Sequence, residues 1–355
     1  MISDGYFDDT WLPFFLANHN QVRYIRTKFY SDCLFMAFSI VRGLLMEHHI
    51  KKWIGLFTLL ASILTPFVSF GQEVTLPSVN LGGTSFLDGV AGPGLLLEET
   101  VEYYHGKRFT DSEGRKIPGD NSIESWLSLT HVAYLTKWKI LGGYYGVEAL
   151  LPIVRADLDT DFGVRDHKGG VGDLIFSPFI LQWVDHKIFN MSYFHRINVP
   201  FTLPTGRYDK DSAINIGNHV YSCNPYYAFT LFITPKLETS WRFHYLWNSK
   251  NHSPPTSFHA DHIQPGQAFH LNYALSYEIF DGWRVGMAGY YLNQITADRV
   301  ENHKRDNSKE KVFAIGPGLM FSKKGFFFYL NAFYETGAEN RPEGMKFSIR
   351  LSKVF

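Results

Sequence analysis

Apolar and polar residues alternate one by one along several stretches in the second half of the chain. In residues 269–279 every second side chain is Phe, Leu, Tyr or Ile, and the positions between them hold His, Asn, Ala, Ser and Glu. Residues 237–248 alternate in the same way, with aromatic residues on one row and Glu, Arg and His on the other. Successive side chains of a β-strand point to opposite faces. Long, aromatic-rich strands of this kind are typical of an outer-membrane β-barrel, whose lipid face is apolar and whose lumen is polar.

The region from residue 95 to residue 355 divides into twelve candidate strands. An even number is the rule for single-chain bacterial barrels. The predicted strands are 95–106, 123–136, 142–153, 171–183, 189–199, 214–230, 237–247, 266–280, 283–295, 311–321, 326–336 and 343–355. The sequence therefore predicts an all-β fold, a transmembrane antiparallel β-barrel of about twelve strands.

The connections between these strands alternate between long and short. The long, polar ones are 107–122, 155–170, 200–213, 248–265 and 296–310, and the short ones are 137–141, 184–188, 231–236, 281–282 and 322–325. Transmembrane barrels have short periplasmic turns and longer outer loops, so both chain ends are expected in the periplasm. A soluble secreted β-sandwich, the remaining alternative fold, has no reason to keep its long loops at one end. The connection 337–342 breaks the order, because it should be external and yet is short.

The last predicted strand ends with Phe355 and carries apolar residues at most alternate positions. It resembles the C-terminal signature by which bacterial barrel-assembly machinery recognises outer-membrane proteins, which makes that machinery an expected partner. Lys353 departs from the signature, because it places a cation on the apolar row. Near the membrane interface such a charge costs only about 0–1 kcal/mol.

Residues 46–71 have the parts of a secretory signal peptide. A basic start after Met46 precedes an apolar run at 53–70, and small residues flank a cleavage site after Gly71. The mature chain is then expected to begin near Gln72. The run is also long enough for a transmembrane helix, although Pro66 interrupts it.

The remaining N-terminal residues are interpreted as two further segments. Residues 1–45 are an upstream extension outside the fold if translation starts at Met46; the alternative is a helical hairpin between residues 33–46 and the signal. Residues 72–94 are rich in Gly, Ser and Leu and show no lasting period. They form either a segment that enters the lumen or a disordered periplasmic tail, and the barrel itself covers residues 95–355.

Composition agrees with membrane-spanning strands and argues against a nucleic-acid-binding protein. Aromatic residues make up 17% and hydrophobic residues 45% of the chain, while the mean hydropathy is only −0.14. This balance fits strands that hide half their residues from lipid better than it fits a helical membrane protein. The 34 basic and 34 acidic residues leave no polybasic field, so nucleic acid is not an expected partner. Of the two cysteines, Cys33 precedes the predicted cleavage site, so Cys223 is expected to be unpaired.

The polar rows of three neighbouring strands provide candidate lumen-lining residues. Charges of both signs in a lumen hold water and orient polar solutes. A barrel of about twelve strands is also wider than the eight-stranded kind that side chains fill. The alternative is that these groups pair across the barrel and close it. The candidates are Glu238, Arg242, His244, His270, Asn272, Glu278 and Arg284.

No catalytic residue, metal site or cofactor is predicted. Residues 259–262 hold two imidazoles and a carboxylate but lack further ligands at a fixed spacing. Residues 157–161 alternate Asp residues without the Gly and bidentate Glu of a Ca²⁺ loop. Both are interpreted as solvated outer loops. An outer-membrane lipid hydrolase is an alternative, but His244 and Ser276 face inward rather than towards lipid, and no Gly-x-Ser-x-Gly elbow is present.

Seven short motifs follow one another along the barrel region. They are GGVGDL at 169–174, LPTGRY at 203–208, NIG at 215–217, NPYYA at 224–228, GYY at 289–291, AIGPG at 314–318 and ENRPEG at 339–344. In this order they resemble the family named for the MetA pathway of phenol degradation, a family of outer-membrane transporters. The resemblance covers roughly residues 82–355. It implies an outer-membrane barrel that passes hydrophobic or aromatic small molecules, without naming phenol as the cargo.

The alternating pattern and the resemblance together predict an outer-membrane channel of a Gram-negative bacterium. Small hydrophobic or aromatic molecules are expected to cross it passively, because no energy-coupling motif is present. The expected partners are these solutes, outer-membrane lipids and the assembly machinery. The alternatives are an outer-membrane lipid hydrolase and a structural or adhesion barrel that conducts nothing.

Overall fold

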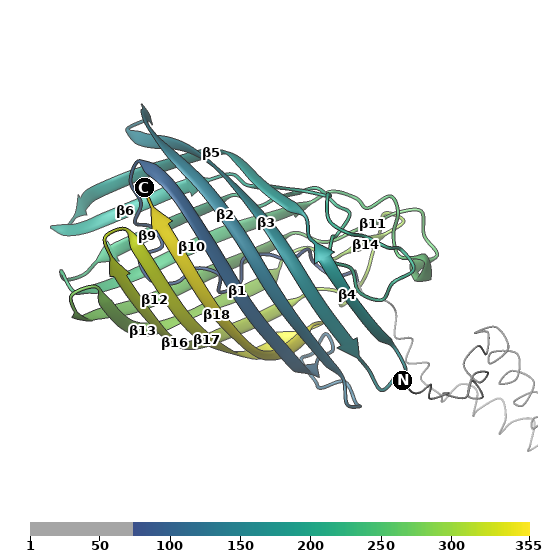
Figure 1. Cartoon of the computed structure of the whole chain (residues 1–355). Coiled ribbons are helices and arrows are strands. Elements are labelled where there is room, and N and C mark those ends of the chain that lie inside the picture. The colour runs from purple at the N-terminus through teal and green to yellow at the C-terminus, as the bar shows by residue number, and fades with distance from the viewer. Residues whose placement is uncertain (1–73) are drawn as a thin grey trace, which may run out of the picture. The chain divides into compact units, whose positions relative to one another are not determined.

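Antiparallel pairing of neighbouring strands closes on itself in this protein, because the first strand, β1 (Gly94–Phe109), also pairs with the last, β18 (Pro342–Val354). The computed structural model describes residues 74–355. Their fold is all-β, a closed antiparallel barrel with twelve strand positions in its wall (Figure 1). This confirms the predicted fold class. The predictions for residues 1–71 lie outside the described residues.

Within the described residues, nine positions of the wall hold single strands and three hold strands that are interrupted part-way. The single strands are β1, β2 (Ser122–Ile140), β3 (Gly143–Asp159), β10 (Leu237–Asn248), β12 (Ala268–Phe280), β13 (Trp283–Gln294), β16 (Lys311–Lys323), β17 (Phe326–Glu339) and β18. The interrupted ones are β4 (Arg165–Val171) with β5 (Leu174–Ile188), β6 (Met191–Asn198) with β7 (Phe201–Leu203), and β8 (Ser222–Cys223) with β9 (Tyr226–Phe232). Outside the wall, β11 (Ile263–Gln264), β14 (Arg299–Val300) and β15 (His303–Lys304) form a small separate sheet, and Thr256–Phe258 form a 3-10 turn.

The two faces of the wall differ as the alternation predicts. On β12, Leu275 and Tyr277 are about half exposed on the outer face, whereas His270, Asn272 and Ser276 on the inner face are buried. An apolar outer face suits lipid, and a polar inner face suits a lumen. Among residues 74–355, no helix is long and apolar enough to cross a membrane.

Several predicted boundaries are wrong. At the periplasmic end, residues 137–141 and 184–188 were expected to form turns, but β2 continues to Ile140 and β5 to Ile188. Two larger errors lie at the outer end of the barrel. Residues 155–170 were expected to form one long loop, but β3 continues to Asp159 and pairs with β4, which leaves only a tight turn between them. Residues 214–230 were expected to form one strand, but the strand begins at Ser222 and breaks at Pro225, which has no N–H to donate. The hairpin was missed because Arg155, Asp157 and Asp159 occupy the row of β3 that is apolar further down the strand, and β4 has charged residues and glycines on both rows, so the pattern of a membrane-spanning strand is lost.

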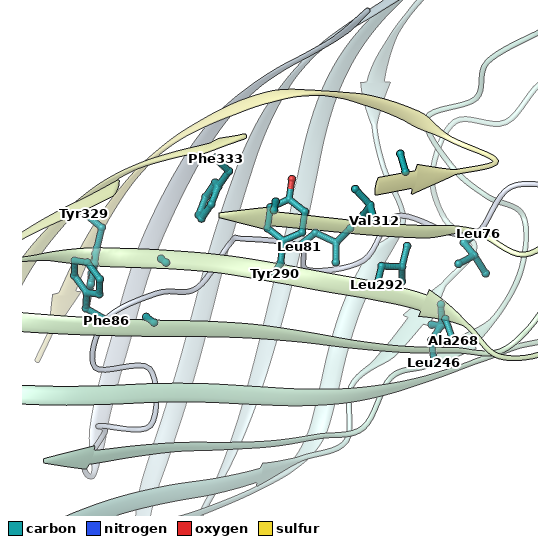
Figure 2. Packing of buried hydrophobic residues seen from close by; sticks show 14 of the residues in the cluster. Leu76, Leu81, Phe86, Leu246, Ala268, Tyr290, Leu292, Val312, Tyr329 and Phe333 are labelled. Atoms are coloured by element: carbon teal, nitrogen blue, oxygen red, sulfur yellow. The ribbon is translucent and has the colours of Figure 1, made fainter. Parts of the chain in front are cut away.

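The segment before β1 packs on the inner side of one half of the wall. Leu76, Leu81 and Phe86 belong to a buried apolar cluster with side chains of β10, β12, β13, β16 and β17 (Figure 2). A Cβ atom on Gly318 of β16 would lie 2.7 Å from the Phe86 ring, so the wall needs a glycine where this ring rests on it. The apolar core of the molecule therefore lies inside the barrel, between this segment and the wall.

The closing seam includes the last residue of the chain. Phe355 donates its N–H to the Leu95 carbonyl at 2.9 Å and accepts the Leu95 N–H at 3.3 Å. The Lys353 ammonium lies 4.1 Å from the centroid of the Phe326 ring and donates to the Lys324 carbonyl at 3.0 Å. The cation on the apolar row is thus held at the rim of the barrel by an aromatic face and a turn carbonyl, which reduces its cost.

Candidate functional site in the barrel lumen

The N-terminal segment, residues 74–93, runs the length of the lumen. At the outer end the Leu76 N–H donates to Glu310 Oε1 at 2.7 Å, beside the first residue of β16. Half-way along, the Gly82 N–H donates to Asn272 Oδ1 at 2.8 Å. Further in, the Gly89 N–H donates to Thr230 Oγ1 at 2.8 Å, before β1 begins at the periplasmic end. Side chains of the wall therefore satisfy backbone groups that have no strand partner.

A buried ionic contact fixes the segment to the wall near its periplasmic end. The carboxylate of Asp88, whose side chain is 6% exposed, accepts two bonds from the Arg242 guanidinium, one of them from Nε at 2.8 Å. Arg196 Nη2 lies 3.5 Å from the same carboxylate and donates to the Asp88 carbonyl at 2.9 Å. Arg242 also lies 4.3 Å from the centroid of the Tyr226 ring. Buried charges persist only when they are paired in this way, so Asp88 is the main electrostatic anchor of the segment.

The seven predicted lumen residues all lie on the inner side of the wall, but they fall into separate groups. Arg242 and His244 line the remaining cavity. His270 stacks on His244 with ring centroids 4.1 Å apart, and Asn272 donates to the Asn80 carbonyl at 3.2 Å. These four residues form two successive cross-strand pairs of β10 and β12, next to the N-terminal segment.

The other three predicted residues bind one another near the periplasmic turn between β12 and β13. Arg284 Nη2 lies 3.2 Å from Glu278 Oε2. Arg284 Nη1 lies 3.3 Å from Ser276 Oγ, which in turn donates to the buried Glu238 carboxylate. These residues therefore form polar contacts within one group instead of facing an open lumen. The sequence analysis left such pairing open as an alternative.

A cavity of about 850 Å³ remains between the N-terminal segment and the opposite half of the wall. Leucine and isoleucine side chains of β1, β2, β3 and β5 give this side an apolar lining: Leu96, Leu127, Leu129, Leu150 and Ile175. Ligand pockets of drug-sized molecules range from about 300 to 1,000 Å³ and are mostly apolar with a few placed polar groups. The cavity has the size and the lining of such a pocket.

On this apolar side of the lumen, His131 of β2 bridges the carboxylates of Glu98 on β1 and Glu148 on β3. His131 Nδ1 lies 3.3 Å from Glu98 Oε1, and His131 Nε2 lies 3.1 Å from Glu148 Oε2. Only the imidazolium form donates from both nitrogens, so the geometry calls for a cation between the two anions. Glu148 also accepts from Asn198 Nδ2 at 2.6 Å, and Arg350 Nε lies 3.6 Å from Glu98. The sequence reasoning missed this group, although the inner row of residues 95–106, which holds Glu98, pointed to it.

Three of the motifs noted in the sequence meet at the break between β4 and β5. Asp173, which is 5% exposed, accepts the Gly206 N–H at 2.8 Å and the Asn218 N–H at 2.7 Å. A Cβ atom on Gly206 would lie 2.7 Å from the Gly172 carbonyl carbon, and one on Gly217 would lie 2.7 Å from that of Gly206. The glycines are therefore needed for close backbone contact, and Asp173 joins the β4–β5 break to both ends of the loop between β7 and β8 at the edge of the cavity.

The outer loops above the lumen are joined by a buried carboxylate. Asp298 is fully buried, and its Oδ1 accepts the Gly266 N–H and Gln294 Nε2, each at 2.7 Å. Its Oδ2 is buried without a partner among the described residues. Burial raises the pKa of Asp298 to about 7, and the nearby Glu310 carboxylate adds to the shift. Within residues 74–355, no three His, Cys, Asp or Glu side chains lie close enough together to hold a metal ion.

Comparison with known protein families shows the family to which the chain belongs. The model of the family described as "Putative MetA-pathway of phenol degradation" matches residues 106–351. The chain belongs to this family. The match covers most of the barrel, including every motif on which the resemblance was noted. No curated protein matches the chain.

Several solved structures are similar to this phenol-degradation-pathway family member. An outer membrane channel of Pseudomonas putida F1 superimposes with a TM-score of 0.66 at 17% identity, over 78% of this chain and 100% of that chain. The transport unit of the autotransporter AIDA-I from Escherichia coli gives a TM-score of 0.46 at 6% identity, over 74% and 90%. The TodX deltaS2S3 mutant, a monoaromatic hydrocarbon channel, gives 0.39 at 7% identity, over 75% and 91%. At these identities the first likeness shows the fold alone.

The closed wall places this family member in the outer membrane of a Gram-negative bacterium. Only helices and closed barrels satisfy all backbone groups within lipid, and the outer face of this wall is apolar. Short turns between β2 and β3, β5 and β6, β12 and β13, and β16 and β17 lie at the end that holds the C-terminus (Figure 1). Since short turns are periplasmic, this end faces the periplasm and the sheet of β11, β14 and β15 faces outward.

Proposed function

We propose that the protein is an outer-membrane channel for the passive passage of small hydrophobic or aromatic molecules. The observation that carries the proposal is the apolar cavity of about 850 Å³ inside a closed wall. Apolar solutes partition from water into such a lining for the same reason that apolar side chains are buried. On β1, β2 and β3 the lining is apolar on either side of the Glu98–His131–Glu148 bridge, so a solute that moves along it also passes these charged groups.

The name of the family supports this class of cargo, and the fold supports a channel. The family description refers to phenol degradation, and the fold is that of a channel protein of Pseudomonas putida F1. The N-terminal segment narrows the bore, because it fills the half of the lumen next to β10–β17. Large hydrophilic solutes are therefore excluded while the segment is anchored.

Uptake by cells tests the channel. The polar, saccharide-rich outer leaflet of a Gram-negative cell slows apolar solutes, so cells are a better test than simple liposomes, which such solutes cross unaided. Cells that produce the protein are expected to take up radiolabelled phenol or toluene faster than cells without it. Equal initial rates would refute the proposal, and they are what a lipid hydrolase or a non-conducting barrel predicts.

A pair of substitutions on neighbouring strands locates the route. Leu129→Trp adds bulk inside the cavity and is expected to slow uptake several-fold. Leu151→Trp is the matched control, since Leu151 is 40% exposed on the outer face of β3 and an aromatic side chain suits the lipid side. Uptake that is unchanged by Leu129→Trp, with equal amounts of folded barrel, would place the route elsewhere.

A protein with this function must be exported, which bears on how the N-terminal residues 1–72 are divided. We propose that translation starts at Met46, so that residues 1–45 are not part of the translated protein. Residues 46–71 are then the signal peptide, and the exported chain begins near Gln72. N-terminal sequencing of the protein from outer membranes is expected to read Gln-Glu-Val-Thr. A sequence that starts upstream of Met46 would show that the extension is retained.

A further inference from the structure

Two neighbouring periplasmic hairpins carry large apolar residues at positions that disfavour them. Leu141 begins the turn between β2 and β3 with a φ of 50°, followed by Gly142 at 82°. Phe189 begins the turn between β5 and β6 with a φ of 47°, followed by Asn190 at 64°. Two-residue turns with both φ values positive prefer Asn-Gly or Asp-Gly, and a bulky residue with positive φ is a strained outlier. Neither turn needs Leu or Phe in order to form.

The same two residues are almost fully exposed. Phe189 is 92% and Leu141 is 86% exposed, and the nearby Trp138 is 74% exposed. Packing inside the protein therefore does not explain their apolar character. Strained and exposed apolar residues that the fold does not require point to contact with something outside the chain.

The two hairpin tips form one surface that continues the lipid-facing wall. Trp183 of β5 donates its Nε1–H to the Leu141 carbonyl at 3.0 Å, which joins the hairpins. The Trp183 ring stacks on His195 with centroids 4.7 Å apart, and Tyr193 stacks on the same imidazole at 5.0 Å. An aromatic belt of this kind marks the level at which a barrel leaves the hydrocarbon. The tips therefore lie at the depth of the phospholipid headgroups.

Basic residues accompany the apolar ones at this level. Lys137 and Lys139 precede Leu141 on β2, and both are exposed. Lys236 is exposed on the next periplasmic turn, and Lys323 and Lys324 are exposed on another. A long lysine side chain lays its methylene stem on apolar surface and extends its ammonium group to the headgroups. Although the whole chain carries 34 basic and 34 acidic residues, this rim presents mainly positive charge.

We propose that the surface formed by the tips of the β2–β3 and β5–β6 hairpins, here called the hairpin patch, binds anionic phospholipid of the inner leaflet. Leu141, Phe189 and Trp138 insert between lipid tails and headgroups, and Lys137 and Lys139 pair with phosphate. The inference uses the proposed function only for the orientation of the barrel. Lipid is the occupant because the patch is continuous with the wall that already faces the bilayer and because its charge is complementary to anionic headgroups.

Native mass spectrometry of the full mature chain tests the proposal. The protein is reconstituted in nanodiscs that contain equal amounts of phosphatidylglycerol and phosphatidylcholine, and the lipids retained after release are counted. The unmodified protein is expected to retain phosphatidylglycerol preferentially. Lys137→Gln with Lys139→Gln is expected to lower this preference by about tenfold, since each basic residue at a membrane surface contributes to anionic-lipid binding. Lys116→Gln with Lys210→Gln, on exposed outer loops, is the matched control and is expected to change nothing.

A second variant separates lipid binding from folding. Leu141→Asn with Phe189→Asn relieves the strained turns, because Asn tolerates positive φ, so the barrel is expected to be at least as heat-resistant as the unmodified protein. Its lipid retention is expected to fall. Equal retention of both lipids by the unmodified protein, or a preference that survives in both hairpin variants, would overturn the proposal and would favour a protein partner for the patch. Solute uptake is measured separately, so failure here is distinguishable from failure of the channel.

Discussion

Asp88 holds the N-terminal segment in the lumen through two guanidinium groups, and its loss has a defined consequence. Asp88→Asn keeps the size of the side chain but leaves Arg242 and Arg196 buried without an anion. Breaking a buried ion pair on one side costs about 3–5 kcal/mol. The segment is therefore expected to leave its place. Liposomes with this variant are expected to swell in small sugars, and liposomes with the unmodified protein are expected to swell much less.

The control for this prediction is Asp111→Asn. Asp111 pairs with the exposed Arg115 on an outer loop, and exposed pairs contribute only about 0–1 kcal/mol. Swelling is expected to stay at the unmodified level. If Asp88→Asn and Asp111→Asn behave alike, the anchor does not depend on charge.

Asp298 gives the outer loops a pH dependence. Its pKa is raised from 3.8 to about 7 in the folded protein, mainly by burial. A carboxyl whose folded pKa exceeds its unfolded value stabilises the fold fully below the unfolded pKa, and this contribution is lost progressively as the pH rises from about 4 to about 7. Hydrogen exchange in the β11–β14–β15 sheet is therefore expected to accelerate between about pH 4 and pH 7 and to level off above pH 7. In Asp298→Asn, which is neutral at every pH, the rates corrected for intrinsic exchange are expected to stay flat; the same acceleration in that variant would exclude Asp298 as the cause.

At the residue scale, the sequence predicted wall residues that contact the N-terminal segment but missed their partners in the segment itself. Arg242 and Asn272 were predicted because they lie on a polar row of a two-faced strand. Asp88 lies in a segment without a period, and nothing in its local sequence pairs it with residues more than a hundred positions away. Long-range ion pairs of this kind depend on how the barrel closes, which only the structure gives.

At the element scale, the strands are predictable where lipid and water impose different faces. β10 and β12 match their predicted ranges to within two residues at each end. The pattern fails for the outer hairpin of β3 and β4, where both faces meet water and no alternation is required. The break at Gly172 and Asp173 was likewise hidden, because its reason is contact with Gly206 in the distant loop between β7 and β8.

The N-terminal segment is the element whose packing is most open to test. Phe86 is fully buried against the wall beside Gly318. Phe86→Ala removes a buried ring, a change that costs about 3–5 kcal/mol. Since the segment has no strand pairing of its own, the loss is expected to appear as faster protease cleavage within residues 74–93, while heat resistance of the barrel wall is nearly unchanged. Phe201→Ala, at a 40% exposed position of the outer face, is the control and is expected to leave cleavage unaltered.

At the scale of the whole molecule, closure of the wall creates both the membrane form and the cavity. The seam between β1 and β18 contains thirteen paired positions, with one irregularity between Gly106 and Arg108. Because every wall strand has two neighbours, no long sheet edge remains for pairing with other chains. The N-terminal segment then fills one half of the interior, which leaves the cavity beside β1, β2 and β3 as the proposed route for solutes.

Phe355 tests how this closed form is assembled. Its backbone completes the seam with Leu95. The centroid of its ring lies 5.6 Å from the Lys353 ammonium, which also lies 4.1 Å from that of Phe326. If assembly machinery reads the terminal aromatic ring, Phe355→Ala lowers the amount of folded barrel in cells several-fold but leaves refolding in detergent unchanged, because the seam bonds are made by the backbone. Phe326→Ala removes the other aromatic contact of Lys353 and is expected to leave both unchanged. Gel mobility of unheated samples measures the folded fraction in each case, and a Phe355→Ala protein that reaches the outer membrane in normal amounts would show that recognition does not use this ring.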